Sequence, residues 1–194
     1  QRAAKREPAG GAGRGGGGGR FTLDSQPIRS RHDTVSLTTR ILEGTAPLAS
    51  IAEAWDAIPQ GRGIQADLYD TYTWASAWLA TQPEETLERV RVVAAFEGEA
   101  LCAVLPLFEA GRGAWESLAK GFRPRFRPVI ANGAALDETC SALADAITRA
   151  GVSELSLPAL PSRDPSSTAL AEALQRNGYD VVRHPGPEEC LAPI

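Results

Sequence analysis

The chain has 194 residues and a formal net charge of −4 at pH 7, which excludes a nucleic-acid-binding surface spread over the whole molecule. Its three cysteines, Cys102, Cys140 and Cys190, lie far apart without CxxC spacing, which excludes a disulfide framework and a cysteine zinc site. No apolar run approaches the roughly 20 residues that span a bilayer, and no signal-peptide stretch is evident. We therefore expect a fragment or processed product of a cytoplasmic protein, with neither membrane nor nucleic acid as a partner.

The first 32 residues have the composition of a disordered tail and linker. Residues 1–20 read QRAAKREPAGGAGRGGGGGR, and glycine with scattered arginine buries too little surface to offset its chain entropy. A phosphate-binding loop would need a strand before it and a helix after it, and this segment predicts neither. A weak contact of the arginines with RNA is the alternative to a solvated tail. His32 beside Asp33 is more typical of a surface position than of a catalytic pair.

We expect the ordered domain over residues 33–184, beginning with a strand and two helices. Residues 34–42 alternate apolar and polar side chains, which predicts a half-buried strand. The first helix has Pro47 in its first turn and ends at Pro59 and Gly61. Its apolar stripe consists of Leu48, Ile51, Ala52, Trp55 and Ile58. The second helix covers about residues 71–80 and places Trp74 and Trp78 on its core face.

Residues 89–108, RVRVVAAFEGEALCAVLPLF, predict the central β-hairpin of a sheet that is covered on both faces. Two apolar runs flank a polar turn in which Gly98 can take a positive φ. Pro106 donates no backbone N–H, so it marks a strand end, an edge or a bulge. Cys102 and Cys140 sit in apolar patterns, and we expect buried thiols in a reducing compartment.

The rest of the domain predicts two strand–helix units and a last strand. The expected elements are a strand at 114–119, a helix at 136–150, a strand at 153–157, a helix from Asp164-Pro165 to Gly178 and a strand at 179–183. An antiparallel middle followed by strand–helix crossovers favours parallel additions to the sheet. The expected fold class is α/β, with a mixed, mostly antiparallel sheet flanked by helices. Residues 185–194 have the composition of a connector.

Several phrases of the sequence also resemble those of a known family. They are Trp55 in the first helix, Tyr72-Thr73-Trp74 with Ala77-Trp78-Leu79, the hairpin ending in Leu105-Pro106-Leu107, Leu155-Ser156-Leu157-Pro158, and the turn from Leu174 to Tyr179. Together they resemble the GNAT acyltransferase fold, and within it the cellulose-biosynthesis-type acetyltransferases, which are related to the FemAB-like aminoacyltransferases. The resemblance covers about residues 35–190.

The resemblance implies the N-terminal half of an N-acyltransferase, in a branch that resembles two GNAT-type halves in tandem. Such an enzyme transfers an acyl group from acetyl-CoA, or another activated acyl donor, to an amine of a sugar, amino acid or cell-envelope precursor. The amine attacks the thioester directly, so the protein mainly positions the reactants and accepts a proton. Residues 185–194 would then lead to a C-terminal GNAT-like domain. The alternative is a non-catalytic binding or scaffolding half that supports a separate catalytic domain.

The resemblance also implies where the acyl donor would bind. In single-domain members a glycine-containing loop before the third main helix holds the CoA pyrophosphate with backbone N–H groups. The corresponding segment here is 127–134, which contains Asn132-Gly133-Ala134 without the full spacing. The donor-side candidates are therefore Arg125, Arg127, Asn132 and Gly133.

Three arginines and two tyrosines complete the candidate set. Arg123, Arg125 and Arg127 alternate with phenylalanines and would share one face of an extended segment, enough to bind a phosphate or carboxylate. The alternative is an exposed strand edge kept soluble by arginine. On the substrate side the candidates are Tyr69, Tyr72 and Arg123, although capping and packing also explain the tyrosines. The sequence contains no metal-ligand grouping, and it does not identify the catalytic residues.

Overall fold

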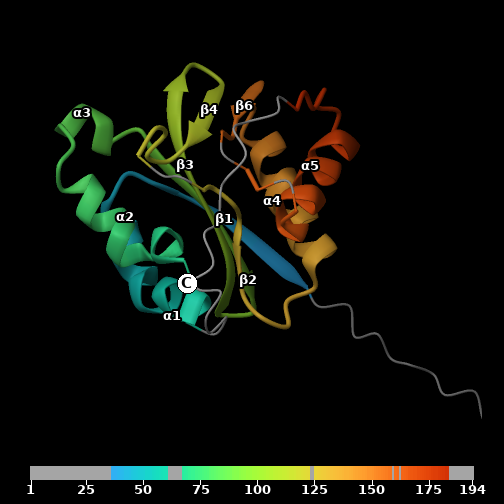
Figure 1. The fold of residues 1–194 in the computed structure, drawn as a ribbon, viewed down its shortest axis with the longest axis horizontal. Coiled ribbons are helices and arrows are strands. Elements are labelled where there is room, and N and C mark those ends of the chain that lie inside the picture. The colour runs from blue at the N-terminus through green and yellow to red at the C-terminus, as the bar shows by residue number, and fades with distance from the viewer. Residues whose placement is uncertain (1–35, 61–66, 123–124, 159, 162, 184–194) are drawn as a thin grey trace, which may run out of the picture. The chain divides into compact units, whose positions relative to one another are not determined.

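A computed structural model describes residues 36–60, 67–122, 125–158, 160–161 and 163–183 of the chain. All of them belong to one compact unit, Val35–Ile194, whose centre is a six-stranded sheet in the order β1-β2-β3-β4-β6, with β5 also paired to β3 (Figure 1). The strands are β1 (Leu37–Glu43), β2 (Val90–Glu97), β3 (Ala100–Gly111), β4 (Ala114–Ser117), β5 (Val129–Ile130) and β6 (Glu154–Ser156). Only the β4–β6 pair is parallel. The predicted α/β class with a mixed, mostly antiparallel sheet is confirmed.

Helices cover both faces of the sheet (Figure 1). On one face lie α1 (Ala52–Gln60) and α2 (Tyr72–Leu79), and on the other lie α4 (Leu136–Arg149) and α5 (Pro165–Arg176). A 3-10 helix, Ala46–Ile51, leads into α1, a second one, Leu68–Asp70, leads into α2, and the short α3 (Glu84–Leu87) precedes β2. In the described part of the chain no helix has the length and apolar character needed to cross a membrane.

The β2–β3 hairpin is the centre of the fold because both of its faces are buried. Along β2, Val92 and Ala94 pack in the core beneath α1 and α2, whereas Val93 packs in the core beneath α4 and α5. Val92, Val93 and Ala94 are all fully buried. Strands buried on both faces have near-continuous apolar sequences, so the hairpin and its two-sided cover are confirmed.

Pro106 lies inside β3, although it was expected to mark a strand end, an edge or a bulge. The strand continues past it to Gly111, and Pro106 is paired in register with Val92. Its carbonyl accepts a hydrogen bond from the Leu118 N–H, so this residue faces the β4–β5 side of β3. On that side β5 pairs only with residues 103–104 and β4 only from residue 107. The missing N–H therefore falls in the gap between two partner strands, where no ladder bond is lost.

Two further predictions need correction. Pro59 was expected to stop the first helix, but α1 includes it and extends to Gln60. The predicted strand at 179–183 is wrong, because these residues form no strand. Tyr179 and Val181 pack against the core under α4 and α5, and the Tyr179 hydroxyl donates a 2.6 Å hydrogen bond to the Val152 carbonyl. The alternating apolar residues therefore reflect packing, without strand pairing.

The chain enters α4 and α5 from the same edge of the sheet. β5 runs in line with β4, since both are antiparallel to β3 and pair with successive parts of it. β6 is parallel to β4. The helix α4 follows β5, and α5 follows β6, so the amino ends of both helices lie beyond the carboxyl ends of these strands. In open α/β sheets this edge is where ligands usually bind.

Candidate functional site

The centre of this edge is a buried group of three charged side chains, here called the Arg127 cluster: Asp70, Arg127 and Asp164. The guanidinium of Arg127 donates from Nε to Asp70 Oδ2 at 2.9 Å and from Nη1 to Asp164 Oδ2 at 2.9 Å. Its Nη2 lies 2.8 Å from the same oxygen of Asp70. The cluster thus joins three segments that are far apart in sequence: the turn before α2, the approach to β5 and the start of α5.

Local sequence places each member of the cluster. Asp164 is the N-cap of α5, and its side chain accepts hydrogen bonds from the N–H and the hydroxyl of Ser166. Asp70 ends the 3-10 helix before α2, and its carbonyl accepts a 2.8 Å bond from the indole N–H of Trp55. Capping and core packing therefore hold both carboxylates in place independently of Arg127.

The charges of the Arg127 cluster interact strongly because little solvent reaches them. The side chains of Asp70, Asp164 and Arg127 are 2%, 13% and 19% exposed. Burial by itself raises the pKa of Asp164, but hydrogen bonds from Ser166 and Arg127 outweigh it and hold the pKa below its usual value. Burial likewise opposes the charge of Arg127, yet its bonds to the two carboxylates raise its pKa further. Asp164 and Arg127 are therefore ionised near neutral pH.

The donor-side candidates Asn132 and Gly133 lie in an exposed turn that leads into α4. The turn closes with a 3.3 Å bond from the Ala134 N–H to the Ala131 carbonyl, and Gly133 has φ +84°. A Cβ added at Gly133 would meet nothing within 4 Å, so this position faces open space. The N-cap of α4, Ala135, makes no side-chain capping bond, so the first N–H groups of the helix remain available.

The first turns of both helices carry further polar groups. Asp137 and Glu138 lie in the first turn of α4, where their negative charge suits the helix dipole and would repel an incoming anion. Among the described residues, the buried hydroxyls of Thr139 in α4 and Ser167 in α5 have no hydrogen-bond partner. Buried unsatisfied polar atoms are rare in native proteins and often occur where a water or ligand binds.

The substrate-side candidates Tyr69 and Tyr72 flank Asp70 in sequence and are half-buried. The ring of Tyr69 packs edge-on against Trp74 with centroids 5.1 Å apart, and Tyr72 packs against Trp55 with centroids 5.8 Å apart. Arg127 binds the carboxylate of Asp70, which lies between the two tyrosines in sequence, whereas the rings themselves contact tryptophans. Both tyrosine rings also have a packing role, as the alternative reading expected.

Two of the three arginines of the predicted series lie within the described residues. Arg127 is bound within its cluster, and Arg125 is half-buried and also engaged in an interaction, whereas Arg123 lies outside the described residues. Phe126, between them, is 1% exposed and belongs to the core. His32, His184 and Cys190 also lie outside the described residues.

Asp164 is the site residue that sequence reasoning missed. Its position before a proline predicted only a helix cap, and it does cap α5 through Oδ1 while Oδ2 binds Arg127. The only sequence signal for this second role is that an aspartate at an N-cap has a second carboxylate oxygen free to bind another group. The sequence alone does not identify that group. Within the described ranges, no group of three or more His, Cys, Asp or Glu side chains is arranged to hold a metal ion.

Comparison with protein-family models and with curated protein sequences finds no match for this chain.

Proposed function

We propose that this domain is the N-terminal half of a GNAT-type N-acyltransferase, which transfers an acyl group from acetyl-CoA or another activated donor to an amine. The acceptor would be an amine of a sugar, an amino acid or a cell-envelope precursor. The second half of the site would come from a C-terminal GNAT-like domain.

The observation that carries this proposal is the order and pairing of the elements. One strand, two helices, an antiparallel β2–β3–β4 meander, a helix and a strand parallel to β4 follow one another as they do in acyltransferases of this fold. The proposal is also supported by the exposed Asn132–Gly133 turn, which precedes a helix whose N-cap makes no side-chain bond.

Within this proposal the domain contributes more to the acceptor side than to the donor side. Arg127 is already neutralised by two carboxylates, and the first turn of α4 carries two acidic residues. Both features weaken the attraction for a pyrophosphate. By contrast, Tyr69 and Tyr72 lie beside the Arg127 cluster, where they would border an acceptor that enters from the α2 side.

The same two features favour a second candidate, a non-catalytic half that supports a separate catalytic domain. A charge cluster that is satisfied internally holds elements together without needing a ligand. In that case the Arg127 cluster would maintain the shape of the domain, and the partner domain alone would bind the acyl donor.

Calorimetric titration with acetyl-CoA separates the candidates. The 194-residue chain is titrated first, and then a longer protein with any downstream domain attached. Binding by the chain itself, weakened in the Arg125→Gln variant and unchanged in the exposed control Arg163→Gln, supports the acyltransferase proposal. Binding only by the longer protein supports the non-catalytic half. Absence of binding to either protein contradicts both candidates.

A further inference from the structure

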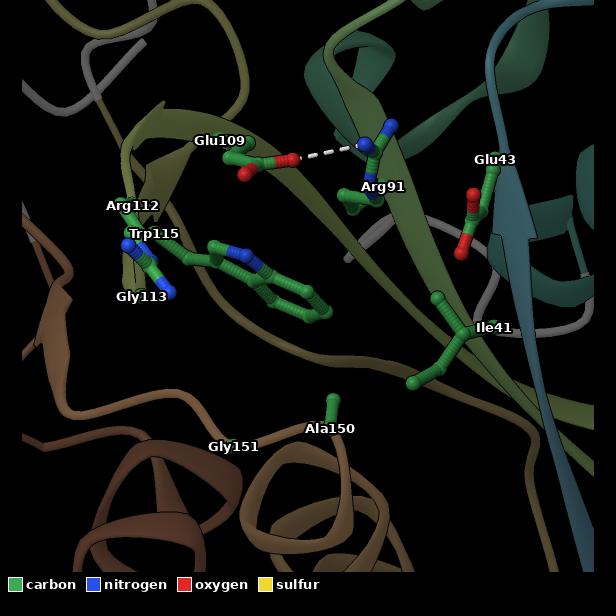
Figure 2. A pocket seen from close by; sticks show the side chains of 9 residues that line it. All are labelled: Ile41, Glu43, Arg91, Glu109, Arg112, Gly113, Trp115, Ala150 and Gly151. Carbon is green, nitrogen blue, oxygen red and sulfur yellow. Dashed lines mark hydrogen bonds and ion pairs between the residues drawn. The ribbon is translucent and has the colours of Figure 1, made fainter.

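A hollow lies on the α4–α5 face of the sheet, away from the Arg127 cluster. Figure 2 shows it from close by. It is an open groove of about 510 Å³ between the β3–β4 turn, the far ends of β1 and β2, and the carboxyl end of α4. The helix α4 has 14 residues, and a helix of that length spans about 21 Å. The groove lies at the carboxyl end of α4, whereas the edge with the Arg127 cluster lies at its amino end. The two sites are therefore separate.

The floor of the groove is rigid and partly aromatic. The indole of Trp115 lies across its middle in Figure 2, with Ile41 beside it. Trp115 is 7% exposed and belongs to the core beneath α4 and α5. The indole is held by the core and adds a small, fixed apolar surface to the floor of the groove.

One ion pair in the groove is fixed and neutral. Arg91 Nη2 donates to Glu109 Oε2 at 2.6 Å, while its Nη1 donates to the carbonyls of Glu88 and Val90 at 2.7 and 2.9 Å. The side chains of Arg91 and Glu109 are 16% and 32% exposed. These bonds cancel the two charges and hold the guanidinium still, so the pair forms a polar wall without net charge.

Two other charges in the groove remain uncompensated. Glu43, from β1, and Arg112, from the β3–β4 turn, are exposed on opposite sides of the hollow (Figure 2). Neither side chain has a hydrogen bond or an ion pair with any residue that the structure describes. Ala150 and Gly151 form a third side at the carboxyl end of α4, where Arg149 in the last turn offsets the partial negative charge of the helix.

From this arrangement we propose that the groove binds a small zwitterion, with its ammonium group toward Glu43 and its carboxylate toward Arg112. The alkyl part between these groups would lie near Trp115 and Ile41. A cation alone would leave Arg112 unpaired, and an anion alone would leave Glu43 unpaired. A ligand with both charges pairs with both side chains.

The width of the groove limits the length of this ligand. The backbones of the β1 strand and the β3–β4 turn are two to three strand spacings apart, which is about 10 to 14 Å. A hydrogen bond of about 3 Å at each end, together with the Glu43 and Arg112 side chains that reach into this width, leaves ligand charges at most about 4 to 8 Å apart. An ω-amino acid with a short alkyl chain, or a dipeptide, falls within this limit. The site is independent of the proposed acyl transfer, since it lies at the other end of the sheet.

The test is a titration of the 194-residue chain with 4-aminobutyrate and 6-aminohexanoate, alongside butylamine and butyrate. Binding is followed through the indole N–H resonances of the four tryptophans, and the Trp115→Phe variant assigns the signal of the groove. We expect 4-aminobutyrate or 6-aminohexanoate to shift the Trp115 resonance and to bind at least about tenfold more tightly than butylamine or butyrate.

Matched variants locate the two charges. Glu43→Gln and Arg112→Gln should each weaken binding of the preferred ω-amino acid about tenfold. Glu53→Gln, an exposed glutamate of α1 on the other face of the sheet, should leave it unchanged. The proposal is overturned if no zwitterion shifts the Trp115 signal, if butylamine binds as tightly as the zwitterions, or if both groove variants keep the original affinity. None of these readouts requires acetyl-CoA, so failure here leaves the proposed function intact.

Discussion

The two ends of the sheet use arginine in opposite ways. At the edge where α4 and α5 begin, Arg127 binds two carboxylates, and the whole cluster is at most 19% exposed. At the other end, Arg91 binds one carboxylate and two backbone carbonyls, while Glu43 and Arg112 have no partner among the described residues. The first end therefore has its charges satisfied by the protein itself, whereas the second leaves charges for a ligand.

This difference indicates which end depends on charge for its stability. Removing one member of a buried ion pair leaves an uncompensated charge in a low-dielectric environment, which is costly. Where the carboxylate left behind is partly exposed, as Glu109 is at 32%, water can take the place of the lost cation, which costs less.

Replacing Arg127 should have the largest effect. The Arg127→Met variant keeps the alkyl stem but leaves the carboxylates of Asp70 and Asp164 without their cation, so we expect the free energy of unfolding to fall by about 3 to 5 kcal/mol. Urea denaturation measures it. Adding Asp70→Leu to this variant should recover part of the loss, since one buried charge is then removed. A loss below about 1 kcal/mol would show that solvent satisfies both carboxylates and that the cluster is not a buried one.

Asp164 should give the cluster a pH dependence. Its pKa is lowered in the folded protein, so folding is favoured above the unfolded-state value of about 4, and this contribution is lost as the pH falls below it. Asn also caps helices well, so Asp164→Asn removes mainly the charge, at a cost of about 1 to 3 kcal/mol at pH 7.

The measurement for Asp164 is urea denaturation between about pH 3 and pH 7, because this range includes the usual pKa of a carboxyl group. The gap in unfolding free energy between the wild type and Asp164→Asn should narrow as the pH falls through that range. Glu172→Gln, at an exposed position of α5, provides the control for loss of a carboxylate as such. A gap that stays constant with pH would contradict a charge interaction.

Much of the fold could be predicted from sequence because apolar periodicity reports burial directly. The hairpin of residues 89–108 and the helix at 136–150 were identified in this way. Periodicity does not distinguish pairing from packing, which is why residues 179–183 were taken for a strand. Periodicity also does not show that β3 changes its partner strand beside Pro106, which is why a proline is tolerated inside this strand.

The charged sites were less predictable because each depends on contacts between distant segments. Arg127 and Asp70 are 57 positions apart, and Arg127 and Asp164 are 37 apart. Sequence spacing suggested that Arg127 faced a ligand together with its neighbouring arginines, whereas the fold gives it two carboxylate partners. The groove was not predicted at all, since its walls come from β1, the β3–β4 turn and the end of α4.

Replacing Arg91 should have the smallest effect on stability and a clear effect on binding. Arg91 is about as buried as Arg127, but Glu109 is 32% exposed and can be solvated once Arg91 is removed, so Arg91→Gln should lower the free energy of unfolding by only about 1 kcal/mol. The same substitution leaves Glu109 uncompensated, which makes the groove more negative. We therefore expect butylamine to bind Arg91→Gln more tightly than the wild type, as measured through the Trp115 indole resonance.

Arg89→Gln is the matched control for this last prediction. Arg89 precedes β2, and its guanidinium carbon lies 4.7 Å from the centroid of the Phe108 ring. Phe108 packs with the core beneath α1 and α2, on the face away from the groove, so this variant should not change butylamine binding. If Arg91→Gln destabilised the protein as much as Arg127→Met, or left amine binding unchanged, the two ends of the sheet would not differ as their charge pairing indicates.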